Sequence, residues 1–224
     1  MDIVLYLVLS FVDVMAILSV IFRFFRFPIR MFIGELVTIG AVLTATSFFM
    51  RLVFNIPELD MGIQYILYIV FFRYLIKIKI FDSFLLASIG YLSITLSQLA
   101  IYYFFAFTGI VTPEDIQSTS NFGTYLIQIS SEIFCFLVAW FFYRANLGFS
   151  FVICPPQDVH LRVKMRGFNL FLLIGIMLSV TALFLAPYLL IYYLNWLHIL
   201  AFIMTIIFCL LYYASNKKDE EDLW

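Results

Sequence analysis

The chain has 224 residues, of which 65% are hydrophobic and only 12% are charged, and its formal net charge is −1. Soluble domains contain about 45–50% apolar and about 25% charged residues, and a soluble fold could not hide this much apolar surface from water. The composition therefore excludes a soluble globular protein, and no basic tract indicates nucleic-acid binding. We expect a protein whose main solvent is the lipid bilayer.

Seven apolar runs follow one another along the chain, and a membrane-spanning helix needs about 20 such residues. The runs cover residues 3–22, 32–54, 61–76, 81–107, 124–143, 168–186 and 194–214. Turn residues and charges separate them, and Pro187 is expected to end the sixth. We predict an all-α, polytopic bundle of about seven spans that forms one domain over residues 1–215, with a short charged tail at 216–224.

The orientation follows from the positions of Lys and Arg, because cytoplasmic loops carry an excess of these residues. With the N-terminus outside and the C-terminus in the cytoplasm, every Lys and Arg except Arg51 falls on the cytoplasmic side. Treating the last two runs as one re-entrant element would give six spans, but Lys217 and Lys218 favour a full hairpin. The N-terminus has no basic region typical of a signal peptide, so we expect the first run to remain as a span. We predict a multi-pass protein of a cell membrane, of the bacterial cytoplasmic type.

One long cytoplasmic segment, residues 145–166, is not a span. Its first part, 147–153, is apolar, and its last part is basic. We expect the apolar part to lie at the membrane interface or to fold back against the bundle.

Ionisable side chains inside a span cost about 2.5–3.5 kcal/mol on insertion scales and usually meet a partner or water. Asp13 and Glu132 lie near the middle of their runs, and Arg51 lies near the outer end of its run. Arg51 either lines an outward-facing cavity, with Asp13, Glu132 or a ligand carboxylate as its partner, or extends to the outer headgroups. Asp13 and Glu132 are expected to bind a ligand or to form a structural polar contact. For Glu35, near the inner end, an ion pair with Arg30 or Arg26 is favoured.

Three further polar residues, Gln64, Gln128 and His198, lie near the outer ends of their runs. Together with Arg51, Asp13 and Glu132 they form the predicted ligand-binding set. The basic residues Arg23, Arg26, Arg30, Lys77 and Lys79 form the predicted contact surface for a partner protein.

The sequence gives little support for an enzyme. Cys154 and His160 are the one Cys/His pair on the cytoplasmic side, but the residues around His160 do not match the small membrane proteases that use such a pair. No nucleotide-binding or metalloprotease motif occurs, and the three cysteines lack CxxC spacing. We expect a non-catalytic protein with no cofactor and no metal.

Three short stretches carry a resemblance to a known family. They are Arg23-Phe24-Phe25-Arg26-Phe27-Pro28-Ile29-Arg30, Asn55-Ile56-Pro57-Glu58 and the Gly90-Tyr91 pair. With the short-looped spans around them, they resemble the membrane sensor domain of accessory-gene-regulator-type peptide-sensing histidine kinases. The resemblance implies a sensor that binds an extracellular peptide or lipophilic signal. Only nine residues follow Ser215, so we expect no kinase domain, and the signal would pass to a membrane or cytoplasmic partner or through a homodimer.

Two other functions fit the same features. A small-molecule transporter, or the substrate-binding membrane subunit of a multi-component importer, would use Asp13, Arg51 and Glu132 as a site at the middle of the membrane. An immunity or assembly protein would act by binding a partner protein within the membrane. The buried charges of Asp13 and Glu132 argue against this function.

Overall fold

The structure is a computed structural model that describes residues 3–112, 115, 121–156 and 167–222. The described residues form helices and connecting segments and contain no strand, which confirms the all-α prediction. The helices are α1 (Ile3–Phe24), a 3₁₀ turn at Ile29–Met31, α2 (Ile33–Phe48), a π-helical turn at Phe49–Val53, α3 (Pro57–Tyr74), α4 (Ile80–Phe107), α6 (Phe122–Arg144), α7 (Phe168–Tyr192), a 3₁₀ turn at Leu194–Trp196, and α8 (Leu197–Asp222).

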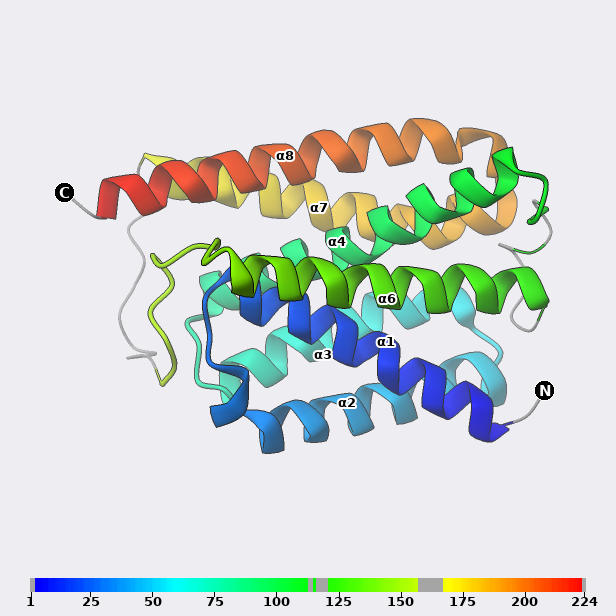
Figure 1. The fold of residues 1–224 in the computed structure, drawn as a ribbon, viewed down its shortest axis with the longest axis horizontal. Helices are drawn as coiled ribbons and strands as arrows, with labels where there is room; N and C mark the ends of the chain where they lie inside the picture. The colour runs from blue at the N-terminus through cyan, green and yellow to red at the C-terminus, as the bar shows by residue number, and fades with distance from the viewer. Residues whose placement is uncertain (1–2, 113–114, 116–120, 157–166, 223–224) are drawn as a thin grey trace.

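The seven long helices lie side by side along the long axis of the molecule, and consecutive helices run in opposite directions (Figure 1). One end, which we call the basic end, carries nine described basic residues: Arg23, Arg26, Arg30, Arg73, Lys77, Lys79, Arg144, Lys217 and Lys218. The other, the acidic end, carries Glu58, Asp60 and Asp115 and the single basic residue Arg51 among the described residues. Arg162, Lys164 and Arg166 lie outside the described residues.

Six of these helices, α1, α2 with its π-helical turn, α4, α6, α7 and α8, are long and apolar enough to cross a membrane. The seventh, α3, has 18 residues and carries Glu58 and Asp60 in its first turn and Arg73 in its last. It begins four residues before the predicted run at 61–76, because Pro57 occupies the first helical turn, where its missing N–H breaks no hydrogen bond.

Two predicted boundaries in the last third of the chain differ from the structure. The sixth run does not end at Pro187, because α7 continues through this residue to Tyr192. A proline costs a helical hydrogen bond, but a chain in lipid has no water to satisfy a fully unwound backbone, so continuing the helix is the better solution. The segment after Ser215 is also helical, because α8 runs on to Asp222. Helices α7 and α8 pack against each other, and each is long and apolar enough to cross a membrane.

Helix α4 is central, since it packs against α1, α3, α6, α7 and α8. Its close contact with α1 is at Gly90. A Cβ added to Gly90 would lie 2.5 Å from Ile21 Cγ1 and 3.2 Å from Ile17 Cγ2, and Ile21 is fully buried. Small residues that let helices approach closely are typical of helix contacts in membranes.

We expect Gly90→Ala to destabilise the protein by about 1–2 kcal/mol, because the overpacking cost exceeds the helix propensity gained. Gly34→Ala is the matched control, since no atom lies within 4 Å of the added Cβ, and it should be neutral or stabilising. Unfolding in detergent measures both. Adding Ile21→Ala to Gly90→Ala should cost less than the sum of the single changes, and strict additivity would show that the Ile21 contact is not the cause.

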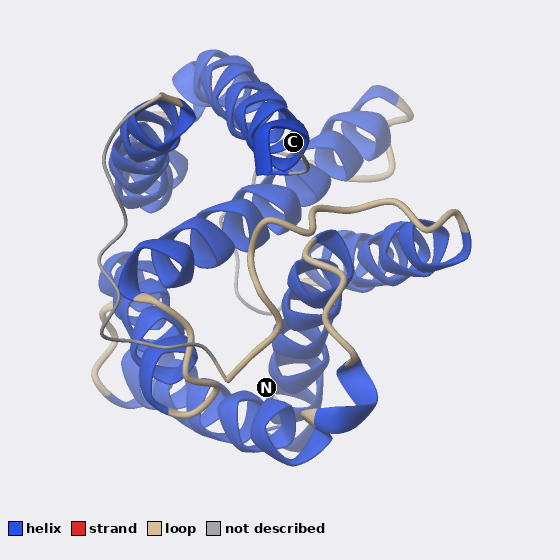
Figure 2. Cartoon of the chain, turned by 90° about the vertical axis from the view of Figure 1, so that its left-hand side faces the viewer, coloured by secondary structure: helices blue, strands red, loops and turns tan. Residues whose placement is uncertain are grey.

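Residues 145–156, which follow α6, fold back across the basic end of the bundle, and Figure 2 views this end directly. The Phe149 amide donates to the Phe24 carbonyl at 2.6 Å, and the Phe149 ring packs on Phe25 and Tyr212. Gly148 has φ +124°, and a Cβ there would lie 2.8 Å from the Arg23 and Phe24 carbonyl oxygens. Of the two alternatives for residues 147–153, folding against the bundle is therefore the one observed.

The charged extension of α8 holds this segment. Asp219 accepts hydrogen bonds from the Ser150 amide at 2.7 Å and from the Ser150 hydroxyl at 2.8 Å. The Lys218 ammonium lies 4.5 Å from the centre of the Phe151 ring, within the range of a cation–π contact. The described part of the predicted charged tail, residues 216–222, is thus helical, and Lys218 and Asp219 contact the segment at the basic end.

The five predicted partner-contact residues differ in their surroundings. Arg23 stacks on the Tyr143 ring at 4.1 Å, and Arg26 donates to the Asn146 carbonyl at 2.9 Å. Arg30 and Lys77 are exposed, and Lys79 is half-buried. Glu35 forms no ion pair with Arg30 or Arg26, so the pairing favoured for it is wrong.

Candidate functional site

The candidate site begins at the π-helical turn that ends the second run. This turn, Phe49–Val53, follows α2 directly and carries Arg51. Asn55 then takes a left-handed conformation with φ +54°, and the chain turns into α3. Single π-helical turns occur often at functional sites, because the extra residue redirects side chains.

Arg51 pairs with Asp60. The Arg51 Nε lies 2.5 Å from Asp60 Oδ2, and the Asp60 side chain is fully buried while that of Arg51 is 40% exposed. The predicted partners of Arg51, Asp13 and Glu132, are not the ones that bind it. The short turn after the π-helix brings α3 back beside Arg51, and this places Asp60 closer than either of them.

Asp60 accepts three hydrogen bonds, which is what a buried carboxylate requires. Besides Arg51, Ser47 donates to Oδ2 at 3.0 Å and the Gln64 amide donates to Oδ1 at 2.9 Å. Asp60 therefore joins α2, the π-helical turn and α3.

The network extends to two tyrosines. The Tyr6 and Ser47 hydroxyls lie 2.9 Å apart, and because Ser47 donates its proton to Asp60, Tyr6 is the donor. Tyr91 donates to Gln64 Oε1 at 3.1 Å, which brings in α4. Connected hydrogen bonds in a low-dielectric interior strengthen one another and fix the positions of the helices that carry them.

This network forms part of the wall of a cavity of about 470 Å³. The cavity is lined by residues of all seven long helices and reaches from the helix ends at the acidic end, at Pro57, Glu58 and Thr124, to Ile17 in the second half of α1. Its polar lining includes Tyr6, Ser10, Asp13, Thr44, Ser47, Arg51, Asp60, Gln64, Tyr91, Thr95, Gln98 and Gln128. The rest is apolar, so the cavity has the mixed lining typical of small-molecule sites.

Asp13 lines this cavity and forms no ion pair with any other described residue. Its Oδ1 is buried and has no hydrogen-bond partner. Asp13 interacts electrostatically with Arg51, Asp60 and Glu132. Glu132, on the neighbouring helix α6, is also buried, and its Oε1 has no partner. The region thus holds two buried carboxyl groups with unused hydrogen-bonding capacity.

Four of the six predicted ligand-binding residues line the cavity: Asp13, Arg51, Gln64 and Gln128. Glu132 does not line it but interacts with Asp13 and Gln128. His198 is exposed on α8 and is not part of the lining, although its neighbour Leu197 is. The prediction for His198 rests on its depth in the membrane, and depth does not specify which face of a helix a residue occupies.

Asp60 is the residue that the sequence prediction missed, because it lies between the predicted runs at 32–54 and 61–76 and so outside any predicted span. The signal was Pro57: a helix that starts there makes Asp60 and Gln64 an i, i+4 pair on one face of α3.

The rim of the acidic end contains a second local network. Asp115 accepts hydrogen bonds from the Thr112 amide at 2.9 Å and the Thr112 hydroxyl at 3.0 Å, and these bonds lower the pKa of the Asp115 carboxyl. Tyr192 donates to Glu58 at 3.3 Å, which links the end of α7 to the start of α3. Glu58 lines the cavity, and Asp115 accepts a hydrogen bond at its carbonyl from Thr124, which also lines it. Acidic residues thus lie at this end of the cavity.

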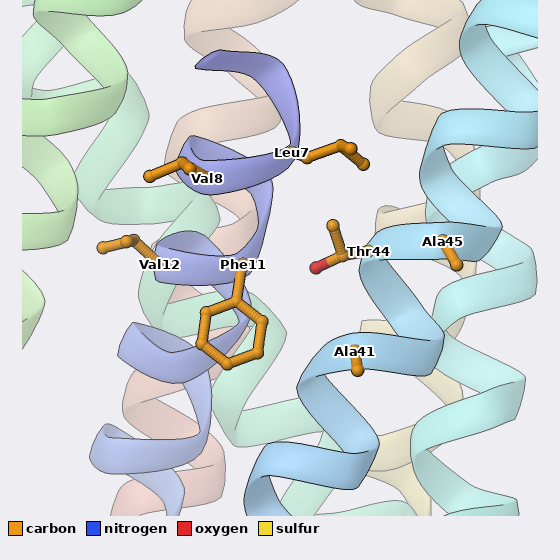
Figure 3. A pocket seen from close by; sticks show the side chains of 7 residues that line it. All are labelled: Leu7, Val8, Phe11, Val12, Ala41, Thr44 and Ala45. Carbon is orange, nitrogen blue, oxygen red and sulfur yellow. The ribbon is translucent and has the colours of Figure 1, made fainter. Parts of the chain in front are cut away.

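A second hollow, of about 390 Å³, lies between α1 and α2 (Figure 3). It is lined by Leu7, Val8, Phe11, Val12, Ala41, Thr44 and Ala45. Thr44 lines both hollows, so they adjoin at α2. Because this groove offers almost no polar group to orient a ligand, the cavity around Asp13 and Asp60 is the candidate site.

The other predicted chemistry concerns Cys154. Partial desolvation raises the pKa of the exposed Cys154 thiol, which is the opposite of what a nucleophilic cysteine needs. His160 lies outside the described residues. Within the described part of the chain, no group of three or more His, Cys, Asp or Glu side chains could hold a metal ion.

A scan against protein-family models and searches of the curated proteins and of the solved structures found no match to this chain. The resemblance to the sensor domain of accessory-gene-regulator-type kinases therefore stays a prediction. What the structure itself supports is a multi-pass membrane protein with a cavity of mixed polar and apolar lining that begins at its acidic end.

Proposed function

We propose that this chain is a non-catalytic sensor or regulatory protein of a cell membrane, which binds a lipophilic or peptide signal at its outer face and acts through a partner protein. The observation that carries the proposal is the cavity at the acidic end, with its network centred on Asp60. A buried ionised carboxylate and a guanidinium are costly in a membrane, and such groups usually mark a functional site.

The proposal includes a topology of seven spans with the N-terminus outside. The alternating helix directions support it, because α3 runs between the two ends like its six more apolar neighbours (Figure 1). The positive-inside rule assigns the basic end to the cytoplasm. The cavity then lies on the outer side, and Arg30 and Lys77 are exposed on the cytoplasmic side for a partner protein.

The test determines from which side of the membrane a water-soluble reagent reaches the cavity. Ser10 lines the cavity, and Ser10→Cys changes one atom. In a background with Cys154→Ser and Cys209→Ser, the remaining native thiol, Cys135, is buried. We expect a membrane-impermeant cationic methanethiosulfonate to label Ser10→Cys in right-side-out vesicles but not in inside-out vesicles.

Arg30→Cys, exposed at the basic end, is the matched control and should show the opposite pattern. If Ser10→Cys reacts only in inside-out vesicles and Arg30→Cys only in right-side-out vesicles, the proposed orientation is wrong. If Ser10→Cys reacts from neither side while Arg30→Cys reacts normally, the outward-open cavity is wrong.

One observation favours the alternative function, a small-molecule transporter or the substrate-binding membrane subunit of an importer. Pro187 lies inside α7, where it removes one helical hydrogen bond, and it lines the cavity. Proline in an apolar span beside a binding site is a feature of many transporters. A transporter exposes its site alternately to both sides. Labelling of Ser10→Cys from both sides, with Arg30→Cys still reacting only in inside-out vesicles, would favour transport over sensing.

A further inference from the structure

The charges that line the cavity are unbalanced. Among its lining residues, three are acidic (Asp13, Glu58 and Asp60) and one is basic (Arg51). The Arg51 guanidinium is bound to Asp60, so it neutralises a carboxylate that is already part of the wall. The charge of Arg51 is thus balanced by Asp60, and an anionic ligand would be repelled by the further carboxyl groups of the lining, Asp13 and Glu58.

Asp13 is the group that remains available to a ligand. Its Oδ1 has no hydrogen-bond partner, although the residue lines the cavity. Glu132, which is 3% exposed, interacts with Asp13 from α6 and also has an oxygen without a partner. Two neighbouring carboxyl groups repel each other when both are ionised, and a cation between or beside them removes this repulsion.

The rest of the cavity suits an organic cation better than a hydrated metal ion. Thr95 is 7% exposed and lines the cavity, and its hydroxyl has no partner, so it offers an unused polar contact. The Tyr6, Tyr91 and Tyr125 side chains also contribute to the lining, and aromatic faces attract cations. Much of the remaining lining is aliphatic, and no group of metal ligands occurs among the described residues.

We propose that the cavity accepts a lipophilic organic cation, such as an amine or quaternary ammonium with an apolar body, and that Asp13 is its counter-ion. This inference rests on the proposed function, because it names the chemical class of the signal that the outward cavity receives. It differs from one of the alternatives that the sequence left open for Arg51, in which a ligand carboxylate is its partner.

The experiment compares two thiol reagents of similar size and opposite charge at Ser10→Cys, in the background without Cys154 and Cys209. The reagents are the trimethylammonium-ethyl and the sulfonatoethyl methanethiosulfonates, applied to right-side-out vesicles. The rate constant of the cationic reagent is divided by that of the anionic reagent. This ratio is then divided by the same ratio measured with free β-mercaptoethanol. We expect this corrected ratio to favour the cation.

The corrected ratio should fall roughly tenfold in Asp13→Asn, because removing one unit charge close to the thiol weakens the attraction of the cation and the repulsion of the anion. Asp13→Glu should keep the ratio, which separates charge from a change of fold. Glu220→Gln, at the basic end, is a second control and should leave the ratio unchanged.

A corrected ratio that favours the anion, or one that Asp13→Asn does not change, would overturn the cation assignment while leaving the outward cavity intact. If neither reagent reacts with Ser10→Cys, the proposed function itself fails, and the cation assignment fails with it.

Discussion

Replacing Arg51 by alanine is expected to destabilise the protein by about 3 kcal/mol, because it leaves the fully buried Asp60 carboxylate without its cation. Asp60 would keep its hydrogen bonds from Ser47 and Gln64, which limits the loss. The measurement is the free energy of unfolding in mixed detergent micelles, or the melting temperature, where each 1 kcal/mol corresponds to about 2–4 °C for a chain of this size.

The control for this prediction is an exposed ion pair in the same chain. Lys217 and Glu220 lie 2.7 Å apart with both side chains largely exposed, so Lys217→Ala should cost no more than about 1 kcal/mol. Combining Arg51→Ala with Asp60→Asn should recover part of the loss, since no buried charge then remains unpaired. If Arg51→Ala is as mild as Lys217→Ala, Arg51 serves as a headgroup anchor and the Asp60 network does not depend on it.

The second large effect is expected at the basic end. Phe149→Ala should destabilise the protein by about 3 kcal/mol, because its ring is 1% exposed and fills the space between Phe25 and Tyr212. The variant should also expose the basic end, which limited proteolysis in inside-out vesicles would detect as faster cleavage.

Phe202→Ala on α8 is the matched control for Phe149→Ala. Phe202 is 68% exposed on a helix that is apolar enough to span a membrane, so its ring would face lipid. Lipid tails are as apolar as the side chain, so little packing is lost. Equal effects of the two substitutions would show that the segment at 145–153 does not stabilise the bundle.

The helical architecture could be predicted from the sequence because lipid imposes a strong constraint. Every backbone polar group in a bilayer must be paired within the protein, so an apolar run of sufficient length becomes a helix. The same constraint explains the error at Pro187: a residue that ends helices in water is tolerated inside α7. In α3, by contrast, charges at both ends shortened the apolar run and hid the true start at Pro57.

The membership of the site was predicted less well than the fold. Depth along a span could be read from the sequence, and this placed Asp13, Arg51, Gln64 and Gln128 at levels that the cavity reaches. The side of each helix that faces the cavity could not be read from the sequence, because most helices here are apolar around their whole circumference. This is why His198 was included although its side chain is exposed.

Contacts between helices were the hardest feature to predict. The π-helical turn shifts the register of Arg51, and only the packing of α2 on α3 shows that Asp60 is its partner. Helices made mostly of apolar residues can pack in many arrangements that bury similar areas. The few polar contacts therefore decide which arrangement forms. Asp60 has this role here, as the shared acceptor for Ser47, Arg51 and Gln64.

We expect the cavity around Asp13 and Asp60 to open to the outside and to receive a ligand there. The most direct measurement is the rate at which the impermeant cationic methanethiosulfonate labels Ser10→Cys, compared between right-side-out and inside-out vesicles. We expect labelling of Ser10→Cys in right-side-out vesicles alone and labelling of Arg30→Cys in inside-out vesicles alone. Labelling of Ser10→Cys from the inside alone, or from neither side, would contradict it.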